Sequence, residues 1–343
     1  MVSKIVLLAA AAALIVGISH AIVLDGTTSN PLGPYKVGKM TTGGLSAGGF
    51  MAVQFHVAFS SSVSGASVFA GGPYYCSGGS EDTALLNCMN PNMVMKPPSP
   101  SSLASYTHLA YDLKLIDNPD NLNTTRVFIY SGELDTVVHR PVVVDLQEYY
   151  ELMAPQGSVV TEFDIMSEHM YPTLNWGEAC TTKGEPFIGK CNYDGAGAAL
   201  AQLYGTLKPK VTQVAANLMQ FSQTQFVSDP ASISLNSIGY IYVPTSCQQG
   251  ATCSLHVEFH GCEQTTADIG EEYPQHVGLN EWAESNDIIV VYPQVVRSYL
   301  SPANPEGCWD WWGYTNKNFA YQSGPQMAFA FKLAQTIMGQ TSA

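Results

Sequence analysis

Ser46 lies at the centre of Gly44-Leu45-Ser46-Ala47-Gly48, which matches the G-x-S-x-G pattern of a nucleophile elbow. Such an elbow is a tight turn from a strand into a helix, and small neighbours of the serine let the two elements approach each other. The residues that follow, 48–59, are apolar nearly all round and predict a buried helix. Because the chain contains 30 glycines, the pattern alone is a weak indication of a serine nucleophile.

Two further residues follow the serine in the order that a hydrolytic triad requires. A serine hydroxyl attacks poorly until a base takes its proton and a carboxylate orients that base. The carboxylate and the histidine are expected in that order, each on a loop after a strand. Asp135 ends the run 126–135, whose first half predicts a strand, and His169 follows the predicted strand 158–165. We therefore predict that Ser46 is the nucleophile, His169 its base and Asp135 the partner of the base.

Other titratable residues fit these roles less well. His56 lies within the predicted buried helix and is more simply explained as a core histidine. His256 and His260 share one face of a predicted strand, a spacing compatible with a metal, but no carboxylates cluster with them. Glu168 adjoins His169 too closely in sequence to orient its imidazole easily. We expect neither a metal nor a cofactor.

The transition state of ester cleavage also needs N–H donors for the developing oxyanion. One donor is expected from the residue after the nucleophile, Ala47, and another from a loop after an early strand, often marked by His-Gly. His260-Gly261-Cys262 follows the predicted strand 255–261, but it lies far downstream of the serine. This displacement predicts a circular permutation, in which the strands that usually come first occupy roughly 238–293.

The elements that would position these residues alternate as in an α/β protein. About seven strands interleaved with helices predict a mostly parallel sheet covered on both faces. The pattern weakens over 171–233, where we expect a lid or insert with a helix near 211–221. A Ser-x-x-Gln capping box at 323–326 predicts the start of the closing helix. No long linker or repeat is visible, so we expect a single domain.

The first residues and the charge indicate the compartment and the kind of partner. Lys4, an apolar run over 5–18 and Ser19-His20-Ala21 are typical of a secretory signal peptide rather than an uncleaved anchor. We expect residues 1–21 to be removed, which leaves 22–343 as a secreted, extracellular protein. The net charge of −14 argues against nucleic acid and membrane surfaces. Charged residues make up only 12% of the chain, which suits a neutral partner, and we expect a monomer.

The chain has eight cysteines, and export favours disulfides. Local spacing predicts the pairs Cys76–Cys88, Cys180–Cys191 and Cys247–Cys253, which leaves Cys262 with Cys308. No C-x-x-C pair is present, so a zinc or redox site is disfavoured. Asn123 begins an N-x-T glycosylation sequon, which matters only if the source cell glycosylates its proteins.

An aromatic segment near the end of the chain is a candidate binding surface. Residues 307–315 read GCWDWWGYT, with Trp309, Trp311 and Trp312 in four positions. Exposed aromatic clusters often mark binding sites, although an aromatic corner packed inside the protein is the alternative. If Cys262 pairs with Cys308, the tryptophans would line a cleft beside the oxyanion loop.

These motifs, taken together and in order, resemble the secreted, single-domain poly(3-hydroxybutyrate) depolymerases with a circularly permuted α/β-hydrolase fold. The resemblance covers most of the chain and rests on the segments GGLSAGGFMA, SGELDTVV, EHMYPT, CNYDGAGAAL…LYG, VEFHGC and GCWDWWGY. It implies Ser46, Asp135 and His169 as the catalytic residues, and the amides of Ala47 and Cys262 as the oxyanion hole. It also implies contact of the Trp309–Trp312 segment with a neutral polyester. No separate polymer-binding module is visible, so adsorption would fall to the apolar surface of the catalytic domain.

Two alternatives remain open at the level of sequence. Looser relatives of this family include feruloyl and acetylxylan esterases, so a plant cell-wall ester is a second candidate substrate. A secreted binding or adhesion protein that keeps the elbow only as a scaffold is a more remote one.

Overall fold

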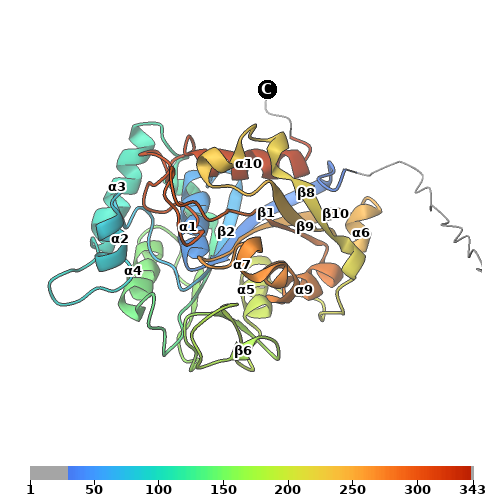
Figure 1. Ribbon diagram of the computed structural model, residues 1–343, viewed down its shortest axis with the longest axis horizontal. Coiled ribbons are helices and arrows are strands. Elements are labelled where there is room, and N and C mark those ends of the chain that lie inside the picture. The colour runs from blue at the N-terminus through green and yellow to red at the C-terminus, as the bar shows by residue number, and fades with distance from the viewer. Residues whose placement is uncertain (1–29, 341–343) are drawn as a thin grey trace, which may run out of the picture. The chain divides into compact units, whose positions relative to one another are not determined.

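The computed structural model describes residues 30–340, and from Pro31 onward the chain forms one compact unit (Figure 1). The predicted signal peptide, residues 1–21, lies outside the described residues. Within the described part of the chain, no helix is long and apolar enough to cross a membrane.

The core of this unit is an eight-stranded sheet in the order β4-β3-β2-β1-β10-β11-β9-β8. Neighbouring strands from β4 to β11 are parallel, whereas β9 pairs with both β11 and β8 in the antiparallel sense. The predicted mostly parallel sheet is therefore confirmed. Its strands are β1 (Lys36–Leu45), β2 (Val63–Phe69), β3 (Arg126–Tyr130), β4 (Val159–Glu162), β8 (Leu218–Ser222), β9 (Ile238–Tyr242), β10 (Thr252–Phe259) and β11 (Ile288–Tyr292).

The position of β1 confirms the permutation. Although β1 is the first strand of the sheet in sequence, it lies between β2 and β10 near the middle of the strand order. β10 follows late in the chain and pairs with β1 in parallel, with Gly44 opposite Phe259. The loops that leave β1 and β10 therefore emerge side by side at one edge of the sheet. The fold is an α/β-hydrolase fold in which the usual first strands come last.

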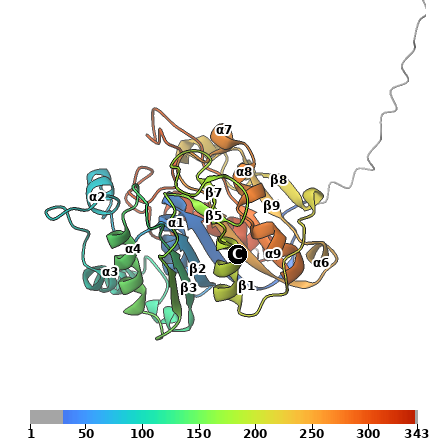
Figure 2. The ribbon, with the colours of Figure 1, turned by 90° about the horizontal axis from the view of Figure 1, so that it is seen from below.

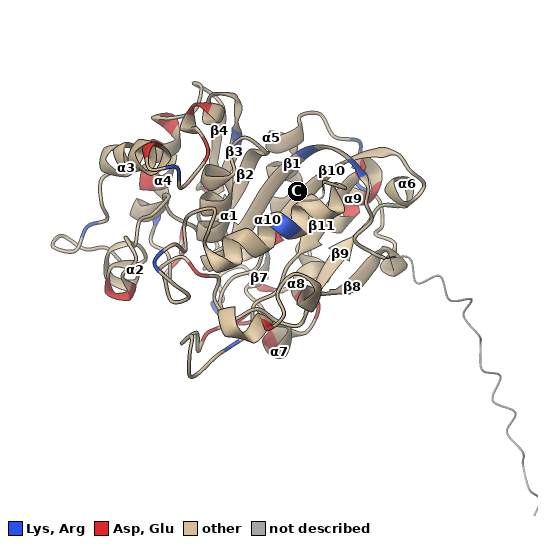
Figure 3. Ribbon diagram, turned by 90° about the horizontal axis from the view of Figure 1, so that it is seen from above, with Lys and Arg blue, Asp and Glu red and all other residues tan. Residues whose placement is uncertain are grey.

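Helices cover both faces of the sheet. Phe55 of α1 packs against Phe259 of β10, and Phe59 stacks on Phe331 of α10, so α1 and α10 share one face (Figure 3). On the opposite face Tyr204 of α5 bonds Thr41 of β1, and α9 packs against α5 and β11. The helices are α1 (Ala47–Ala58), α2 (Glu81–Asn87), α3 (Pro100–Asp112), α4 (Arg140–Glu151), α5 (Gly195–Tyr204), α6 (Thr245–Gln248), α7 (Thr266–Ile269), α8 (Glu272–His276), α9 (Leu279–Asn286) and α10 (Pro325–Ile337).

The segment 171–233, predicted as one lid or insert, divides into parts with different places in the fold. Its first part forms a small sheet in the order β5-β7-β6, from β5 (Tyr171–Thr173), β7 (Ile188–Lys190) and β6 (Glu178–Ala179). Figure 2 labels β5 and β7, and Figure 1 labels β6. α5 then packs against β2 and β3, and β8 extends the main sheet. The helix predicted near 211–221 is wrong, because a short 3-10 turn at Ala215–Asn217 leads directly into β8.

The predicted capping box of the last helix is also wrong. Gly324 is the N-cap residue of α10, and no side chain caps this end. Gln326 is buried, and its side-chain oxygen accepts a hydrogen bond from the backbone N–H of Asp310 at 2.8 Å. The glutamine therefore ties α10 to the tryptophan segment instead of reaching back to Ser323.

All eight cysteines form disulfides, and the four pairs are those predicted from spacing. They join Cys76 to Cys88, Cys180 to Cys191, Cys247 to Cys253 and Cys262 to Cys308. The first three close short loops, whereas the last joins the segment after β10 to the tryptophan segment.

His56 is a core histidine, as predicted. It is fully buried in α1, where Nδ1 bonds the hydroxyl of Tyr150 at 2.9 Å and Nε2 bonds that of Thr125 at 2.7 Å. Burial penalises the charged imidazolium and lowers the pKa of His56 to about 3. The side chain is therefore neutral in the folded protein at any pH near neutrality.

The neutral His56 is expected to make stability depend on pH. An unfolded histidine binds a proton below a pKa of about 6.5, so between that pH and about 3 the unfolded state holds one more proton than the folded state at this position. The free energy of unfolding should therefore fall on acidification from pH 6.5, by up to about 1.4 kcal/mol per pH unit from His56. Urea unfolding at several pH values checks this. The slope should be smaller by that amount in His56→Gln, and an unchanged slope would contradict the assignment.

Candidate active site

Ser46 occupies the turn between β1 and α1 with a backbone conformation that few side chains adopt. Its φ is 58° and its ψ is −122°, and its N–H donates to the carbonyl of Phe69 on β2 at 2.8 Å. A positive φ is strained for a residue with a Cβ, and the surrounding structure must hold it in place. This is the geometry of the predicted elbow. It presents the serine at the edge of the sheet where β1 ends.

The two glycines of the G-x-S-x-G pattern are required by close backbone contacts. A Cβ on Gly48 would lie 2.0 Å from the carbonyl oxygen of Phe259, and one on Gly44 would lie 2.4 Å from the carbonyl oxygen of Gly48. Because both obstacles are backbone atoms, no rotamer change relieves them. Glycine at these positions lets the start of α1 approach the end of β10. The pattern therefore reflects the packing that brings the loop after β10 to the serine.

Asp135 and His169 form a hydrogen-bonded pair. Nδ1 of His169 lies 2.8 Å from Oδ2 of Asp135, and the side chains are 5% and 1% exposed, so the pair is shielded from water. The other oxygen of Asp135 accepts from the N–H groups of Val137 at 2.8 Å and Val138 at 2.9 Å. Burial alone would raise the pKa of Asp135. Attraction to His169 and these hydrogen bonds outweigh burial, so the pKa lies below its usual value. Asp135 is therefore ionised throughout the neutral range.

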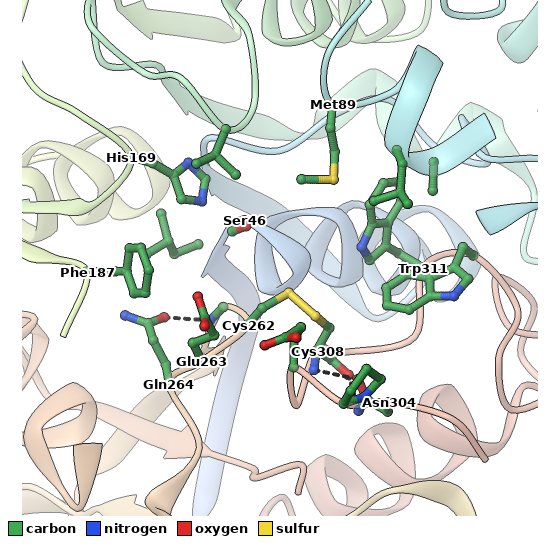
Figure 4. A pocket seen from close by; sticks show the side chains of 18 of the residues that line it. Ser46, Met89, His169, Phe187, Cys262, Glu263, Gln264, Asn304, Cys308 and Trp311 are labelled. Atoms are coloured by element: carbon green, nitrogen blue, oxygen red, sulfur yellow. Dashed lines mark hydrogen bonds between the residues drawn. A yellow bond between two sulfur atoms is a disulfide. The ribbon is translucent and has the colours of Figure 1, made fainter. Parts of the chain in front are cut away.

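Ser46 and His169 line one cavity of about 510 Å³. Figure 4 shows the imidazole of His169 facing Ser46 across one end of it. Most of the lining is apolar and includes Leu85, Met89 and Phe187, while Glu81, Lys183, Glu263 and Glu306 contribute charged groups. Leu85, Met89 and Phe187 were not predicted from sequence. Leu85 lies on the short helix α2 and Met89 and Phe187 lie in loops, so no long hydrophobic period indicates which of these side chains faces a cavity.

The loop after β10 reaches Ser46 as predicted. A Cβ on Gly261 would lie 3.3 Å from Cβ of Ser46, so this peptide lies directly against the serine. The N–H groups of Ala47 and Cys262 donate to no protein acceptor among residues 30–340. Ala47 is the first residue of α1, and the N–H groups at a helix start lack intrahelical partners. Two free donors are therefore available near Ser46.

Gly261 is held by hydrogen bonds at both its N–H and its carbonyl oxygen. Its N–H donates to Oε1 of Gln264 at 2.6 Å, and its carbonyl lies 2.7 Å from Nδ1 of His260. The N–H of Val295 donates to Nε2 of His260 at 3.3 Å, so Nδ1 must carry the proton and donate to the Gly261 carbonyl. Burial lowers the pKa of His260 to about 4, which keeps this ring neutral. His260 is thus used within the loop and does not pair with His256, which bonds Thr41 and Glu258. The expectation that no carboxylate lies near these histidines is therefore wrong, because Glu258 lies 3.0 Å from Nε2 of His256.

The tryptophan segment is only partly at the cavity. Trp309 is fully buried, with its ring 4.9 Å from that of Phe259, and it does not line the cavity. Its predicted contact with substrate is therefore not supported, because this side chain fills the core under the loop. Trp311, stacked on Phe50 at 3.9 Å, and Trp312 do line the cavity. The Cys262–Cys308 disulfide also lines it and fixes this segment beside the loop after β10.

The described residues contain no group of three or more His, Cys, Asp or Glu side chains arranged to hold a metal ion. A serine on a strained turn, a histidine held by an ionised aspartate and two free N–H donors are the parts used in acyl transfer.

Comparison with known proteins identifies the family. No family model matches the chain. A poly(3-hydroxybutyrate) depolymerase of Delftia acidovorans is 43% identical over 294 residues, which are 84% of this chain and 57% of that protein. A polyhydroxybutyrate depolymerase of Talaromyces funiculosus is 34% identical over 308 residues, 84% of this chain and 86% of that protein. The chain thus spans little more than half the length of the first relative and most of the second.

Two solved structures share the fold. A PHB depolymerase with one serine replaced by alanine, complexed with an R3HB trimer, superposes with a TM-score of 0.82 at 31% identity and covers 91% of this chain and 99% of its own. The PHB depolymerase of Penicillium funiculosum gives a TM-score of 0.80 at 32% identity over the same shares. With this identity and coverage in both comparisons, the chain belongs to the poly(3-hydroxybutyrate) depolymerase family.

Proposed function

We propose that the protein is a serine esterase that hydrolyses poly(3-hydroxybutyrate) or a related aliphatic polyester through an acyl-enzyme. The observation that carries the proposal is the convergence of three features on one cavity. These are the strained Ser46, the buried His169–Asp135 pair, and the free N–H groups of Ala47 and Cys262.

The acylation step uses each of these groups. Nδ1 of His169 is engaged by Asp135, which leaves Nε2 to take the proton of Ser46 as its oxygen attacks the ester carbonyl carbon. The N–H groups of Ala47 and Cys262 receive the negative charge that forms on the carbonyl oxygen. The carbon–oxygen bond to the leaving alcohol then breaks, and His169 returns the proton to that oxygen. One end of the polymer leaves as an alcohol, and the other remains as an ester of Ser46.

Deacylation repeats these steps with water as the nucleophile. His169 takes a proton from the water as its oxygen attacks the acyl carbon, and the same N–H groups stabilise the second oxyanion. When the bond to Ser46 breaks, His169 returns the proton to the serine oxygen. The product is a carboxylic acid, and the enzyme regains its starting state without a cofactor.

The lining of the cavity supports a polyester as substrate. Trp311, Met89 and Phe187 offer apolar surface to a chain of neutral ester units, and both curated relatives are named for this polymer. Trp311 and Trp312 are the proposed contacts of the tryptophan segment. The four disulfides support action outside the cell after removal of residues 1–21. We expect one catalytic domain per chain and a monomer in solution.

Turnover of three substrates side by side tests this function. The purified protein should clear a suspension of poly(3-hydroxybutyrate) and release hydroxybutyrate oligomers that mass spectrometry identifies. Feruloyl esters and acetylated xylan should be poor substrates, and a preference for either would favour the cell-wall esterase instead. A fluorophosphonate probe should label Ser46, because only an activated serine reacts. Absence of labelling would favour a non-catalytic binding protein.

A further inference from the structure

The loops that carry Asp135 and His169 are bound to each other along their length. We call residues 131–138, after β3, the acid loop, and residues 165–170, after β4, the histidine loop. The N–H of Glu133 donates to the carbonyl of Ile165 at 2.8 Å, and that of Leu134 donates to the carbonyl of Ser167 at 3.0 Å. These backbone bonds set the distance between the loops. The last of these backbone bonds is made by Leu134, one residue before Asp135.

Glu168 continues the connection past that point. Its carboxylate accepts from the N–H of Thr136 at 3.2 Å and from the hydroxyl of Thr136 at 3.0 and 3.2 Å. It also accepts from the N–H of His169 at 3.1 Å. Thr136 directly follows Asp135, and Glu168 directly precedes His169. One side chain therefore holds the backbone next to both members of the hydrogen-bonded pair.

The hydrogen bonds of the acid loop show why this contact is needed. The N–H groups of Val137 and Val138 donate to Asp135, and the N–H of Thr136 donates to Glu168. Without Glu168 the Thr136 N–H would turn to water, and beyond the Leu134–Ser167 backbone bond only the hydrogen bond between Asp135 and His169 would connect the two loops. The N–H of Glu168 donates to the carbonyl of Cys180 at 2.9 Å, which anchors this residue to the loop closed by the Cys180–Cys191 disulfide.

We propose that Glu168 is a positioning residue that keeps Asp135 and His169 in the geometry needed for proton transfer. The proposal rests on the function proposed above, in which His169 is the base. Glu168 does not act as a countercharge for a cation, because it makes no ion pair with lysine or arginine in the described part of the chain. All its partners are neutral donors. What it supplies is acceptor oxygens, and a side chain with one such oxygen should replace it in part.

Two substitutions at this residue and one control test the proposal. Glu168→Ala should lower kcat for a soluble ester about 10- to 100-fold and leave KM unchanged, because misplacing a catalytic group slows the chemical step without weakening binding. Glu168→Gln keeps one acceptor oxygen and should recover kcat to within about fivefold of the wild type. Glu133→Ala removes an exposed carboxylate from the same acid loop whose side chain has no bonding partner among the described residues. Glu133→Ala should change neither kcat nor KM.

Thr136→Val gives a second test that does not depend on the stability of Glu168→Ala. It removes one donor to Glu168 at an exposed position, so the fold should be retained, and kcat should fall about threefold. The low-field proton NMR signal of Nδ1–H, shared by His169 and Asp135, should weaken in Glu168→Ala and return in Glu168→Gln. This signal reports the pair whatever the substrate is.

The outcomes separate the proposal from the function on which it rests. If wild-type protein hydrolyses no ester and resists the fluorophosphonate, the proposed function fails, but the NMR signal still tests the positioning. If the wild type is active and Glu168→Ala matches Glu133→Ala in kcat and in the NMR signal, the positioning role is refuted. Equal losses in Glu168→Ala and Glu168→Gln would refute it too, because they would show that acceptor oxygens are not what Glu168 provides.

Discussion

Replacing Ser46 with alanine is expected to lower kcat for ester hydrolysis by about 10⁴-fold or more. The change removes the only atom of this residue that forms a bond with substrate and leaves the N–H groups of Ala47 and Cys262 in place. Binding should therefore persist, and KM or the affinity for a non-hydrolysable oligomer should change little. Initial rates on a soluble ester, with active-site titration of the wild type, measure the effect.

The matched control for this substitution is Ser62→Ala. Ser62 is an exposed serine in the turn after α1, and removal of its hydroxyl should leave kcat unchanged. The two variants should unfold at similar temperatures, because each loses a single oxygen atom. If Ser46→Ala kept even a tenth of wild-type turnover, Ser46 would not be the nucleophile and the proposed mechanism would fail.

Replacing Asp135 with asparagine is expected to lower kcat by a similar factor, about 10⁴-fold, while the fold is retained. The reason lies in the two oxygens of Asp135. Oδ1 accepts from two backbone N–H groups, so the amide oxygen of asparagine would take this place and its NH₂ group would face His169. Nδ1 of His169 would then have to accept a hydrogen bond, which moves the ring proton to Nε2. In that tautomer the histidine cannot take the proton of Ser46.

Asp164→Asn is the control for this prediction. Asp164 is exposed beyond the end of β4, and its conversion removes the same charge from the same region of the protein. Its kcat should match the wild type, and thermal unfolding should show that both variants are folded. A kcat for Asp135→Asn within tenfold of the wild type would mean that the hydrogen bond to His169 does not set its tautomer.

The parts of the site that could be predicted from sequence are those set by local backbone packing or by the order of the parallel strands. Gly44 and Gly48 are required by backbone atoms within a few ångströms, so the elbow leaves a local pattern around Ser46. Asp135 and His169 were predictable because parallel strands deliver the residues after them to one edge of the sheet. The displaced His260-Gly261 was informative for the same reason, since it marks the strand that must lie beside β1.

The errors arose where distant contacts override local preference. Residues near 215–222 have the composition of a helix, but residues 218–222 pair with the free edge of β9 and form strand β8. Gln326 stands in the correct position for a capping box, yet its side-chain oxygen instead accepts a hydrogen bond from the backbone N–H of Asp310. Trp309 and Trp311 cannot be told apart by composition, although one fills the core and the other lines the cavity. The contact of Glu168 with Thr136 joins two loops, and no sequence period records it.

The permuted strand order also sets the order in which the parts of the candidate site are synthesised. The ribosome makes Ser46 first, then Asp135 and His169, and only much later the Cys262 amide and the Cys308 that tethers the tryptophan segment. A nascent chain therefore contains its serine turn and the Ala47 amide long before the second proposed oxyanion donor, the Cys262 amide, has been made. Until β10 inserts beside β1, the partner surface of Gly48 is missing as well, so the turn itself lacks support. Under the proposed mechanism, a fragment that ends before β10 should therefore hydrolyse no ester.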